Sequence, residues 1–549
     1  MKERGTKRRL SDLVFWMLPI IALAVGCSFT PPDIPETTTA MLDLQQFNRR
    51  EELAVLKAQP SNTVSVDALQ NIANSFLKTK NDGRSAEGGR TALITNVNKL
   101  PSLTDKRFIR TVNNGRSLEN VEEEPVELYC FTVENPDAEN DGFILTSNDD
   151  RIGYILAVVD NGDLTDTENP FTEFFTARLA DYIEETIAVY SDITGEETQA
   201  ALEKWQSIDP EARTLTAHWG VVGDNYVATG GYDSDFTSFH KDNLIKTKWG
   251  YDAPYNAYVD YYQDRNNKLG SKNYVAGCGP VAVAQLIAYW EYISNTNKPI
   301  SFNNVPAEPE NLNNPARAGW NGTYNFTNLT AQAAISKTGT GAAETALRGQ
   351  VAALMHHAGL SINAEYLGDY NTIAWTDKIA SGFRDIMGYT SSYSDFIDGT
   401  VLTDSYSSFS ITYKNNSKDW VISQLTAKPK ARPILVRGDK ITIDSSTQKK
   451  EIGGHFWLID NYGTITYYTE YLNRKDDTKS VKTVYTSTWT FSNCIMVHCN
   501  LGWDGWNNGW YLYGIFDTSH MAALGENDYR DSAKNGDYSN NIHMFAPYR

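Results

Sequence analysis

The chain has 549 residues, of which 41% are hydrophobic and 21% charged, and this composition excludes a disordered, collagen-like or multi-span membrane protein. The length corresponds to about three or four domains, and the net charge of −19 disfavours a nucleic acid as the principal partner. The five cysteines are too few for a disulfide scaffold, and their odd number leaves at least one thiol unpaired.

Residues 1–27 have the pattern of an export signal. Basic residues dominate the first nine positions, and the apolar run from Leu13 to Val25 is shorter than the roughly 18 residues of a membrane span. The run leads into Gly26-Cys27 and resembles a bacterial lipoprotein signal, in which the cysteine is lipidated and becomes the new N-terminus. Residues 28–60 are then a tether, and the protein is exported and held at the outer membrane or cell surface by its lipid anchor only. An ordinary cleaved signal with a chance cysteine is the alternative.

Residues 61–220 are predicted to form one compact α+β domain. Apolar residues at helical spacing predict one helix through Leu69 and Leu77 and another through Phe175 and Ile187. Between these helices, residues 129–133, 142–145 and 152–159 are separated by Asn, Asp and Gly turns. They predict three strands of an antiparallel meander.

A second domain is predicted over residues 244–549. Residues 221–243, rich in Gly, Asp, Ser and Asn, are interpreted as a linker and a candidate processing region. Helices dominate up to about residue 425, among them one through Leu347 and Ala358 with Gly359 as its C-cap, and strands dominate the remainder. The predicted fold class is therefore α+β.

Cys278 has the most informative surroundings of the five cysteines. It lies in Gly277-Cys278-Gly279-Pro280, ahead of an apolar segment that predicts a helix. Because proline is tolerated only in the first helical turn, Cys278 falls at the helix N-terminus, where free N–H groups and the helix dipole favour a thiolate. The same N–H groups can hold an oxyanion, and the flanking glycines permit close approach of a substrate. Cys278 is a candidate nucleophile, with a buried structural cysteine as the alternative.

A thiolate nucleophile needs an imidazole that exchanges a proton with it and a third group that orients the ring. His455 opens an apolar strand after two glycines, and Asn500 follows another strand. An asparagine carboxamide can accept the imidazole N–H, so Cys278, His455 and Asn500 form a candidate catalytic set. His356 and His357 lie inside a predicted helix and are interpreted as structural or surface residues.

Several separated motifs together resemble the streptopain-like cysteine peptidases, secreted bacterial enzymes of papain-like fold that are made as zymogens. These motifs are residues 249–256, 273–285, 351–359 and 432–438, followed by Gly454-His455 and Asn500, and the resemblance covers roughly residues 244–520. It implies a helical half that carries Cys278 as nucleophile. It also implies an antiparallel β half that carries His455 as general acid and base and Asn500 as the residue that orients the imidazole. Protein or peptide substrates, a thioester acyl-enzyme and the absence of any metal or cofactor are implied as well.

Residues 61–220 resemble the propeptide of the same family, which is related to the Spi-type inhibitors. The resemblance rests on a helix ending at residues 74–77, the strand at 129–133 and the segment 142–151. It implies an intramolecular inhibitory pro-domain that occludes the cleft until the linker is cut. A structural or adhesion domain is the alternative.

Two positions depart from the family pattern. Tyr251 stands where the family has a glutamine whose amide contributes to the oxyanion hole, so a phenol has to replace that donor. Leu501 stands where a tryptophan usually shields the hydrogen bond between histidine and asparagine, and Trp503 keeps the next aromatic position. Tyr251 and Trp503 are therefore candidate oxyanion or substrate residues. Residues 467–490 predict an inserted hairpin with its turn near residues 474–480.

Weaker patterns indicate structure rather than a site. Cys494, His498 and Cys499 lack a fourth ligand for structural zinc, and residues 137–148 lack the glutamate that ends a calcium loop. A disulfide between Cys494 and Cys499 has poor geometry along one strand, and Cys130 is interpreted as a buried thiol.

The leading hypothesis is an exported, lipid-anchored zymogen of a cysteine endopeptidase. The changes at Tyr251 and Leu501 support an alternative, a catalytically impaired surface lipoprotein that binds peptides in a papain-like cleft. An amidase or transpeptidase acting on cell-wall peptides is a third hypothesis.

Overall fold

The computed structural model describes the larger part of the chain and leaves its first 47 residues out. The described residues are 48–57, 64–82, 92–101, 109–113, 118–122, 126–135, 140–165, 170–208, 226–259, 261–263, 269–294, 324–366, 372–383, 418–443, 450–473, 480–483, 494–516 and 542–547. All of them lie in one compact unit, residues 44–549. The predicted export signal, Cys27 and residues 28–47 of the predicted tether lie outside the described residues. The interpretation of residues 28–60 as a tether is wrong for residues 49–57, which form a helix that buries Leu53 and Val55 against Tyr190. Within the described ranges, none of the helices combines the length and the apolar character of a membrane span.

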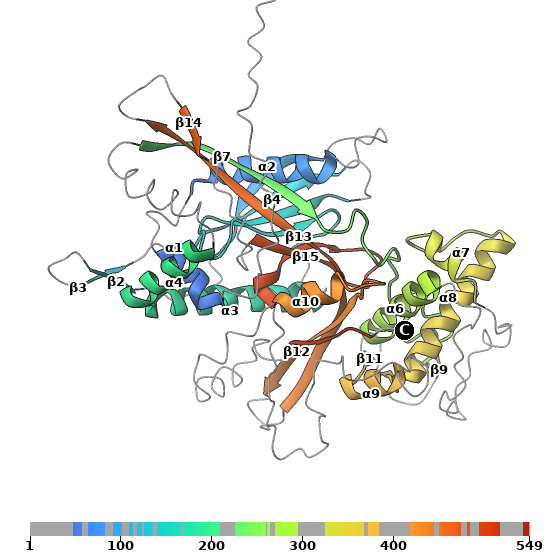
Figure 1. Ribbon diagram of the computed structural model, residues 1–549. Coiled ribbons are helices and arrows are strands. Elements are labelled where there is room, and N and C mark those ends of the chain that lie inside the picture. The colour runs from blue at the N-terminus through green and yellow to red at the C-terminus, as the bar shows by residue number, and fades with distance from the viewer. Residues whose placement is uncertain are drawn as a thin grey trace, which may run out of the picture. The chain divides into compact units, whose positions relative to one another are not determined.

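The fold combines helices with antiparallel strands, which confirms the predicted α+β class (Figure 1). The helices are α1 (Arg49–Lys57), α2 (Val66–Asp82), α3 (Pro170–Asp192), α4 (Gly195–Ile208), α6 (Cys278–Ser294), α7 (Phe326–Ala331), α8 (Ala342–Ser361), α9 (Thr376–Ser381), α10 (Lys418–Leu425) and the 3₁₀ helix η7 (Tyr513–Phe516). The strands are β1 (Leu93–Lys99), β2 (Ile109–Asn113), β3 (Leu118–Glu122), β4 (Leu128–Glu134), β5 (Gly142–Ser147), β6 (Ile155–Val159), β7 (Tyr226–Ser238), β8 (Tyr261–Gln263), β9 (Leu269–Asn273), β10 (Glu365–Tyr366), β11 (Thr372–Ile373), β12 (Ile434–Ile443), β13 (Lys450–Asn473), β14 (Ser480–Thr483), β15 (Ile495–Asn500), β16 (Gly509–Leu512) and β17 (Ile542–Phe545).

The N-terminal helices and strands follow the sequence pattern closely. The predicted helix through Leu69 is α2, whose apolar face is fully buried, and the predicted helix through Phe175 is α3. The three predicted strands are β4, β5 and β6, and they pair antiparallel in chain order. Both the helical spacing and the antiparallel meander are therefore confirmed.

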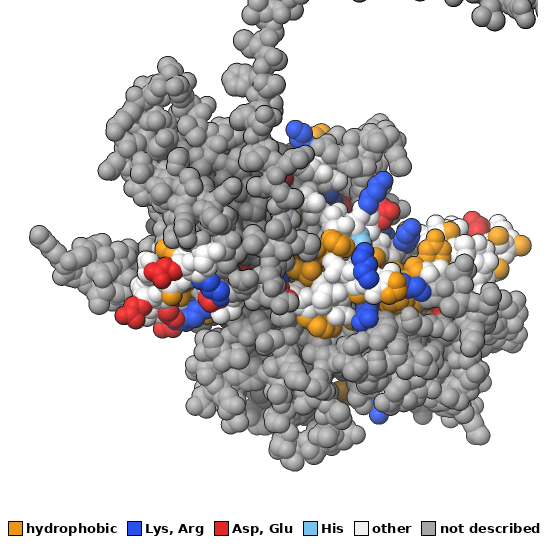
Figure 2. Space-filling model, in the orientation of Figure 1, with side chains coloured by type: hydrophobic (Ala, Val, Ile, Leu, Met, Phe, Trp, Pro, Cys, Tyr) orange, Lys and Arg blue, Asp and Glu red, His pale blue; other side chains and the backbone are white. Residues whose placement is uncertain are grey.

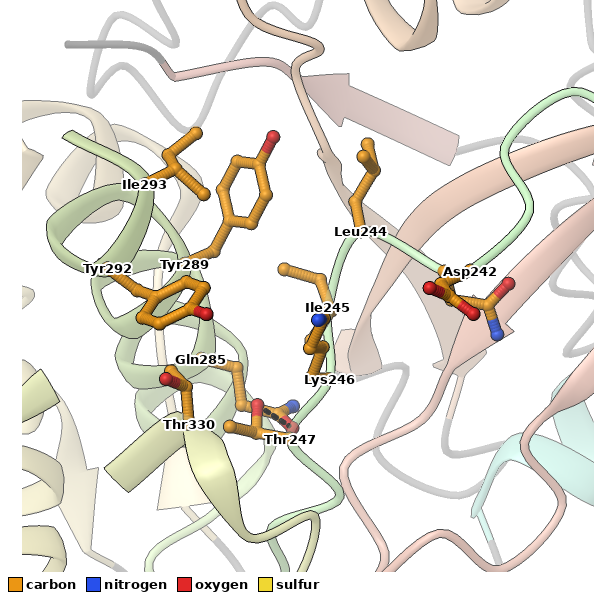
Figure 3. Close-up of a pocket in the computed structure, with 11 residues that line it drawn as sticks. Asp242, Leu244, Ile245, Lys246, Thr247, Gln285, Tyr289, Tyr292, Ile293 and Thr330 are labelled. Atoms are coloured by element: carbon orange, nitrogen blue, oxygen red, sulfur yellow. Dashed lines mark hydrogen bonds between the residues drawn. The ribbon is translucent and has the colours of Figure 1, made fainter. Parts of the chain in front are cut away.

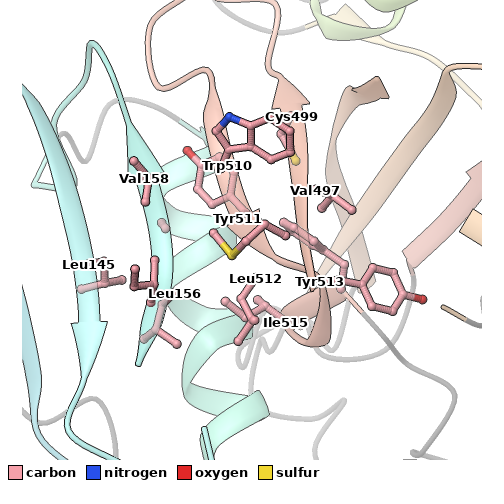
Figure 4. Close-up of a cluster of buried hydrophobic side chains, with 14 of the residues drawn as sticks. Leu145, Leu156, Val158, Val497, Cys499, Trp510, Tyr511, Leu512, Tyr513 and Ile515 are labelled. Atoms are coloured by element: carbon pink, nitrogen blue, oxygen red, sulfur yellow. The ribbon is translucent and has the colours of Figure 1, made fainter. Parts of the chain in front are cut away.

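One antiparallel sheet joins the N-terminal and C-terminal parts of the chain. Among the described residues it is 11-stranded, with the order β1-β4-β5-β6-β16-β15-β13-β12-β17 and with β7 and β14 both paired to β13. The junction is the β6–β16 pair, where Val158 lies opposite Trp510. Leu145, Leu156 and Val158 pack with Val497, Tyr511 and Leu512 in one hydrophobic core (Figure 4). The sheet and its core therefore continue across the boundary predicted between the two domains.

The interpretation of residues 221–243 as a linker is wrong for residues 226–238, which form β7. This strand runs beside β13 over most of its length (Figure 1). Its last residues alternate, with Ser234 and Phe236 buried and Asp235 and Thr237 exposed. Phe236 packs between Phe76 and Trp510, with ring centroids 4.5 Å and 4.8 Å away. The Gly, Asp and Ser content hid this two-residue period, because the apolar positions are few.

The helical half is built on α6, which is buried almost all round and lies beside α8 (Figure 1). The predicted C-cap at Gly359 is wrong, because α8 continues to Ser361 and its C-cap is Ile362. Gly359 serves close packing instead. A Cβ at this position would lie 2.2 Å from the Tyr366 hydroxyl and 3.6 Å from the Pro280 ring. The glycine thus leaves room for the Tyr366 hydroxyl beside α8.

Two surface features complete the fold. The predicted hairpin insertion is confirmed in its first part, where β13 and β14 pair antiparallel from Thr469 and Thr483 to Leu472 and Ser480. On the face shown in Figure 2, acidic side chains gather over α1 and α4, and basic side chains are interspersed with apolar ones elsewhere on its described part. Exposed charges of this kind add little to stability, since surface ion pairs contribute about 0–1 kcal/mol.

Candidate active site

Cys278 is the first residue of α6, as the position of Pro280 predicts. The turn before it requires glycine, because Gly277 has a φ of +83° and a Cβ there would lie 2.4 Å from Thr372 Cβ. The first helical hydrogen bond, from Val281 N to Gly277 O at 3.1 Å, closes directly over the cysteine. The sulfur is thereby fixed at a helix N-terminus with its side chain only partly accessible.

The thiol of Cys278 is subject to opposing influences. Burial raises its pKa, whereas contacts with the Phe456 backbone, the Tyr251 phenol and the Gly279 backbone lower it, as does the charge of Arg437. Burial dominates, so the pKa of Cys278 lies above the ordinary thiol value. The predicted helix-terminus stabilisation of a thiolate is therefore outweighed by burial in this state of the molecule.

Arg437 lies on β12, and its charge acts on the Cys278 thiol. Its guanidinium is buried, lies over the rings of Trp375 and Phe456 at 5.8 Å and 5.3 Å, and donates to the Ala374 carbonyl at 3.4 Å. A buried cation at this position favours a negative charge on the sulfur. The sequence motif included Arg437 but gave no sign of this role.

His455 lies on β13, and its imidazole is 2% exposed. Its Nδ1 is 3.4 Å from the Tyr251 hydroxyl, which in turn contacts the Cys278 thiol. Its Nε2 is buried and has no hydrogen-bond partner of good geometry within the described residues. Burial lowers the pKa of His455 to about 4, against an opposing contact with the Leu501 backbone. The imidazole is therefore neutral at pH 7 and able to accept a proton on Nδ1.

The lowered pKa of His455 predicts a pH-dependent stability. Between pH 6.5, the ordinary value, and about pH 4, the unfolded chain binds a proton that the folded chain does not. The stability contribution is complete above pH 6.5 and is lost as the pH falls, by about 3 kcal/mol across this window. We expect urea unfolding of a Cys278→Ala chain to show this loss and a Cys278→Ala, His455→Gln chain to show less of it. Equal losses in both chains would contradict the assignment.

Asn500 ends β15 and is buried, but the structure does not show it hydrogen-bonded to His455. Its Nδ2 donates to the Thr247 carbonyl at 2.7 Å. Its Oδ1 accepts from Gln285 Nε2 at 3.2 Å and from the Gly502 N–H at 3.3 Å. The neighbouring Leu501 is fully buried and contacts His455 through its backbone. The structure therefore brings Asn500 into the same site without the predicted contact.

Tyr251 and Trp503 lie together over the site, with ring centroids 4.8 Å apart. Burial raises the pKa of Tyr251 well above the ordinary phenol value, so its hydroxyl stays protonated and can donate. This hydroxyl contacts both Cys278 and His455. A hydrogen-bond donor placed between the nucleophile and the base can donate to the oxyanion that forms when the sulfur attacks a carbonyl carbon.

Phe171, in the first turn of α3, packs against His455. Its ring is 1% exposed and meets the imidazole edge-on, with centroids 6.2 Å apart. Trp457 lies stacked 6.1 Å from the same imidazole and 5.8 Å from the Phe171 ring. Sequence patterns predicted α3 as a helix but carried no sign that its first turn would reach the histidine.

Other predicted features have ordinary structural partners. His498 Nδ1 lies 2.6 Å from buried Asp460 Oδ1, and His357 Nδ1 lies 2.6 Å from the Tyr324 hydroxyl. His356 is buried, whereas Cys130 is half-buried and its pKa is raised to about 11 by burial. In the part of the chain that the structure describes, no group of three or more His, Cys, Asp or Glu side chains is arranged to hold a metal ion. Residues 136–139, which include the start of the segment compared with a calcium loop, lie outside the described ranges.

Comparison with known proteins finds a family match. Residues 249–511 match a family model described as the Peptidase C10 family. No curated protein matches the chain. The matched range contains Tyr251, Cys278, His455, Asn500 and Trp503, whereas Phe171 and the rest of the N-terminal part precede it.

Proposed function

Residues 249–511 belong to the peptidase C10 family of streptopain-like cysteine endopeptidases, and from this premise we propose that Cys278 is the nucleophile and His455 the general acid and base. The observation that carries the assignment is the Tyr251 hydroxyl, which contacts the Cys278 thiol and lies 3.4 Å from His455 Nδ1. Nδ1 is thus the ring nitrogen on the side of the Tyr251 hydroxyl, and it is the proposed acceptor of the thiol proton. The proposed fold of this segment is papain-like.

In the proposed reaction, Cys278 Sγ attacks the carbonyl carbon of a peptide while its proton passes to His455 Nδ1. The oxyanion is held by the Cys278 N–H at the start of α6 and by the Tyr251 O–H. The amine leaves with the proton from His455, which gives a thioester acyl-enzyme. Water, deprotonated by the same imidazole, then hydrolyses the thioester.

We further propose that residues 61–220 act as an inhibitory pro-domain of a zymogen. What supports this is the contact of Phe171 with His455, together with the burial of that imidazole, because a substrate needs access to the histidine. The proposed cut in residues 221–243 has to avoid β7, whose residues are paired in the sheet. The segment directly after that strand is exposed at Phe239, Lys241 and Asp242. Among the described residues it is the best candidate for the cleavage site.

The proposed setting is outside the cytoplasm. The pattern of residues 1–27 supports export and lipidation at Cys27. Residues 28–47 are the proposed tether, and the lipid is the only proposed contact with a membrane. The proposed partners are protein or peptide substrates and the chain's own pro-domain, without nucleic acid. No cofactor has a part in the proposed chemistry.

The test is the fate of the purified chain beginning at Ser28 under reducing conditions. We expect it to trim itself to a fragment that begins within residues 239–243, identified by intact mass, because these residues follow β7 and Phe239, Lys241 and Asp242 are exposed. A sample alkylated with iodoacetamide should stay whole. If the untreated chain does not trim itself, and it still cuts no added peptide after a related active peptidase has cut it behind β7, the zymogen proposal fails. The peptide-binding alternative would then take its place.

A further inference from the structure

A closed set of buried hydrogen bonds links three segments that meet behind the active site. Gln285 on α6 donates from Nε2 to Asn500 Oδ1 at 3.2 Å. Its Oε1 accepts from the Thr247 hydroxyl at 3.0 Å and from the Trp249 N–H at 3.2 Å (Figure 3 shows the bond to Thr247). Asn500 closes the set by donating to the Thr247 carbonyl at 2.7 Å. The side chains of Thr247, Gln285 and Asn500 are each at most 2% exposed.

Backbone groups fix the direction of every bond in this set. The Trp249 N–H can only donate, so the oxygen of Gln285 faces it and the nitrogen of Gln285 faces Asn500. The Thr247 carbonyl can only accept, so it takes the nitrogen of Asn500. The oxygen of Asn500 then accepts from Gln285 and from Gly502, which uses both of its lone pairs. The oxygen of Asn500 is thus fully occupied within this set.

Each joined segment carries one group of the active site. Gln285 lies seven residues after Cys278, two turns along the same helix. Trp249 precedes Tyr251 by two residues, and Asn500 adjoins Leu501, whose backbone contacts His455. One buried side chain therefore ties together the segments that carry the thiol, the phenol and the contact to the imidazole.

We propose that Gln285 is a positioning residue, which places the Tyr251 phenol against Cys278 and His455 by holding Trp249 and Asn500. The inference rests on the proposed catalytic role of Cys278. It assigns Asn500 a place in this hydrogen-bonded set rather than a direct bond to the imidazole. Gln285 is also the one polar side chain between Val281 and Ala288 in α6, which is the sequence signal for such a role.

The test compares Gln285→Met, which keeps the volume and removes every bond, with Gln350→Met as a matched control. Gln350 is another helix glutamine, and it accepts from Asn325 N at 2.6 Å, away from this site. Both variants are made in the full chain, and two quantities are measured. One is the pH dependence of Cys278 alkylation by iodoacetamide, followed by peptide mass mapping. The other is kcat and KM for a quenched fluorescent peptide, measured after each chain has been trimmed by the same added peptidase.

We expect Gln285→Met to lower kcat about 10- to 100-fold with little change in KM, because a displacement of about 1 Å in a site has effects of this size. The alkylation midpoint should also move to higher pH, since the phenol contact that lowers the thiol pKa is weakened. Adding Gln285→Met to an Asn500→Ala chain should lower kcat by a smaller factor than it does in the parent chain. Thr247→Val, which removes one bond only, should cause the same changes in smaller degree if Gln285→Met does not fold.

The inference is overturned if Gln285→Met folds and keeps the alkylation midpoint of the parent chain. If Gln285→Met does not fold, the inference is overturned when Thr247→Val shows no shift of that midpoint. If the parent cuts no peptide but Gln285→Met still shifts the midpoint, the positioning role stands and the proposed peptidase reaction fails. The alkylation measurement thereby separates the two proposals.

Discussion

Cys278→Ala is expected to abolish peptide hydrolysis by the trimmed enzyme, with a loss of about 10⁵-fold or more in kcat. The thioester cannot form without the sulfur, and neither of the neighbouring groups, the His455 imidazole and the Tyr251 phenol, can replace it as a nucleophile at this position. The measurement is steady-state cleavage of a quenched fluorescent peptide, with the parent and the variant trimmed by the same added peptidase.

Cys130→Ala is the matched control for this experiment. Cys130 lies half-buried on β4, and burial raises the pKa of its thiol to about 11, so that it has little thiolate at pH 7. We expect this variant to keep the parental kcat. If Cys278→Ala kept activity while Cys130→Ala lost it, the nucleophile would be misassigned.

Tyr251→Phe is expected to lower kcat about 100- to 1000-fold, the usual cost of one oxyanion donor. The change removes only the hydroxyl that contacts Cys278 and lies 3.4 Å from His455 Nδ1, and it keeps the ring that packs on Trp503. KM should change little, because the hydroxyl acts mainly on charge that develops in the transition state. The measurement is kcat and KM for the same peptide, together with the thermal unfolding midpoint as a check of folding.

Tyr251→Gln is the informative partner of this variant, because it restores a side-chain amide at the position. We expect it to retain more activity than Tyr251→Phe, since a hydrogen-bond donor is present again. Parental activity in Tyr251→Phe would show that the phenol oxygen takes no part and that only the contact of the ring with Trp503 matters.

Local sequence patterns predicted those parts of the fold that local forces determine. The 3.6-residue period gave α2, α3 and α8, and the position of Pro280 gave the start of α6 at Cys278, because a proline fits only the first turn of a helix. The meander β4-β5-β6 followed from short strands between turn residues. β7 was missed because its glycines and charged residues obscured a short alternation.

Contacts between distant segments could not be predicted in this way. No local pattern states that β6 pairs with β16, about 350 residues away, or that Phe171 meets His455. The partner of Asn500 was predicted as His455 from a resemblance, whereas the structure shows Gln285, because hydrogen-bond partners depend on packing that residue order does not encode. The prediction that the helix N-terminus favours a thiolate at Cys278 failed for the same reason. The burial that raises the pKa of this thiol is a property of the assembled site.

The β6–β16 pair has a consequence for what proteolysis alone can achieve. A cut after β7 breaks one peptide bond, but it leaves the backbone ladders of β6 with β16 and of β7 with β13 intact, along with their common core. The cut chain should therefore persist as a two-piece complex that migrates as one species in gel filtration and separates only in denaturant. Forced apart, the C-terminal piece would present a bare strand edge at Gly509–Leu512, which is a template for aggregation.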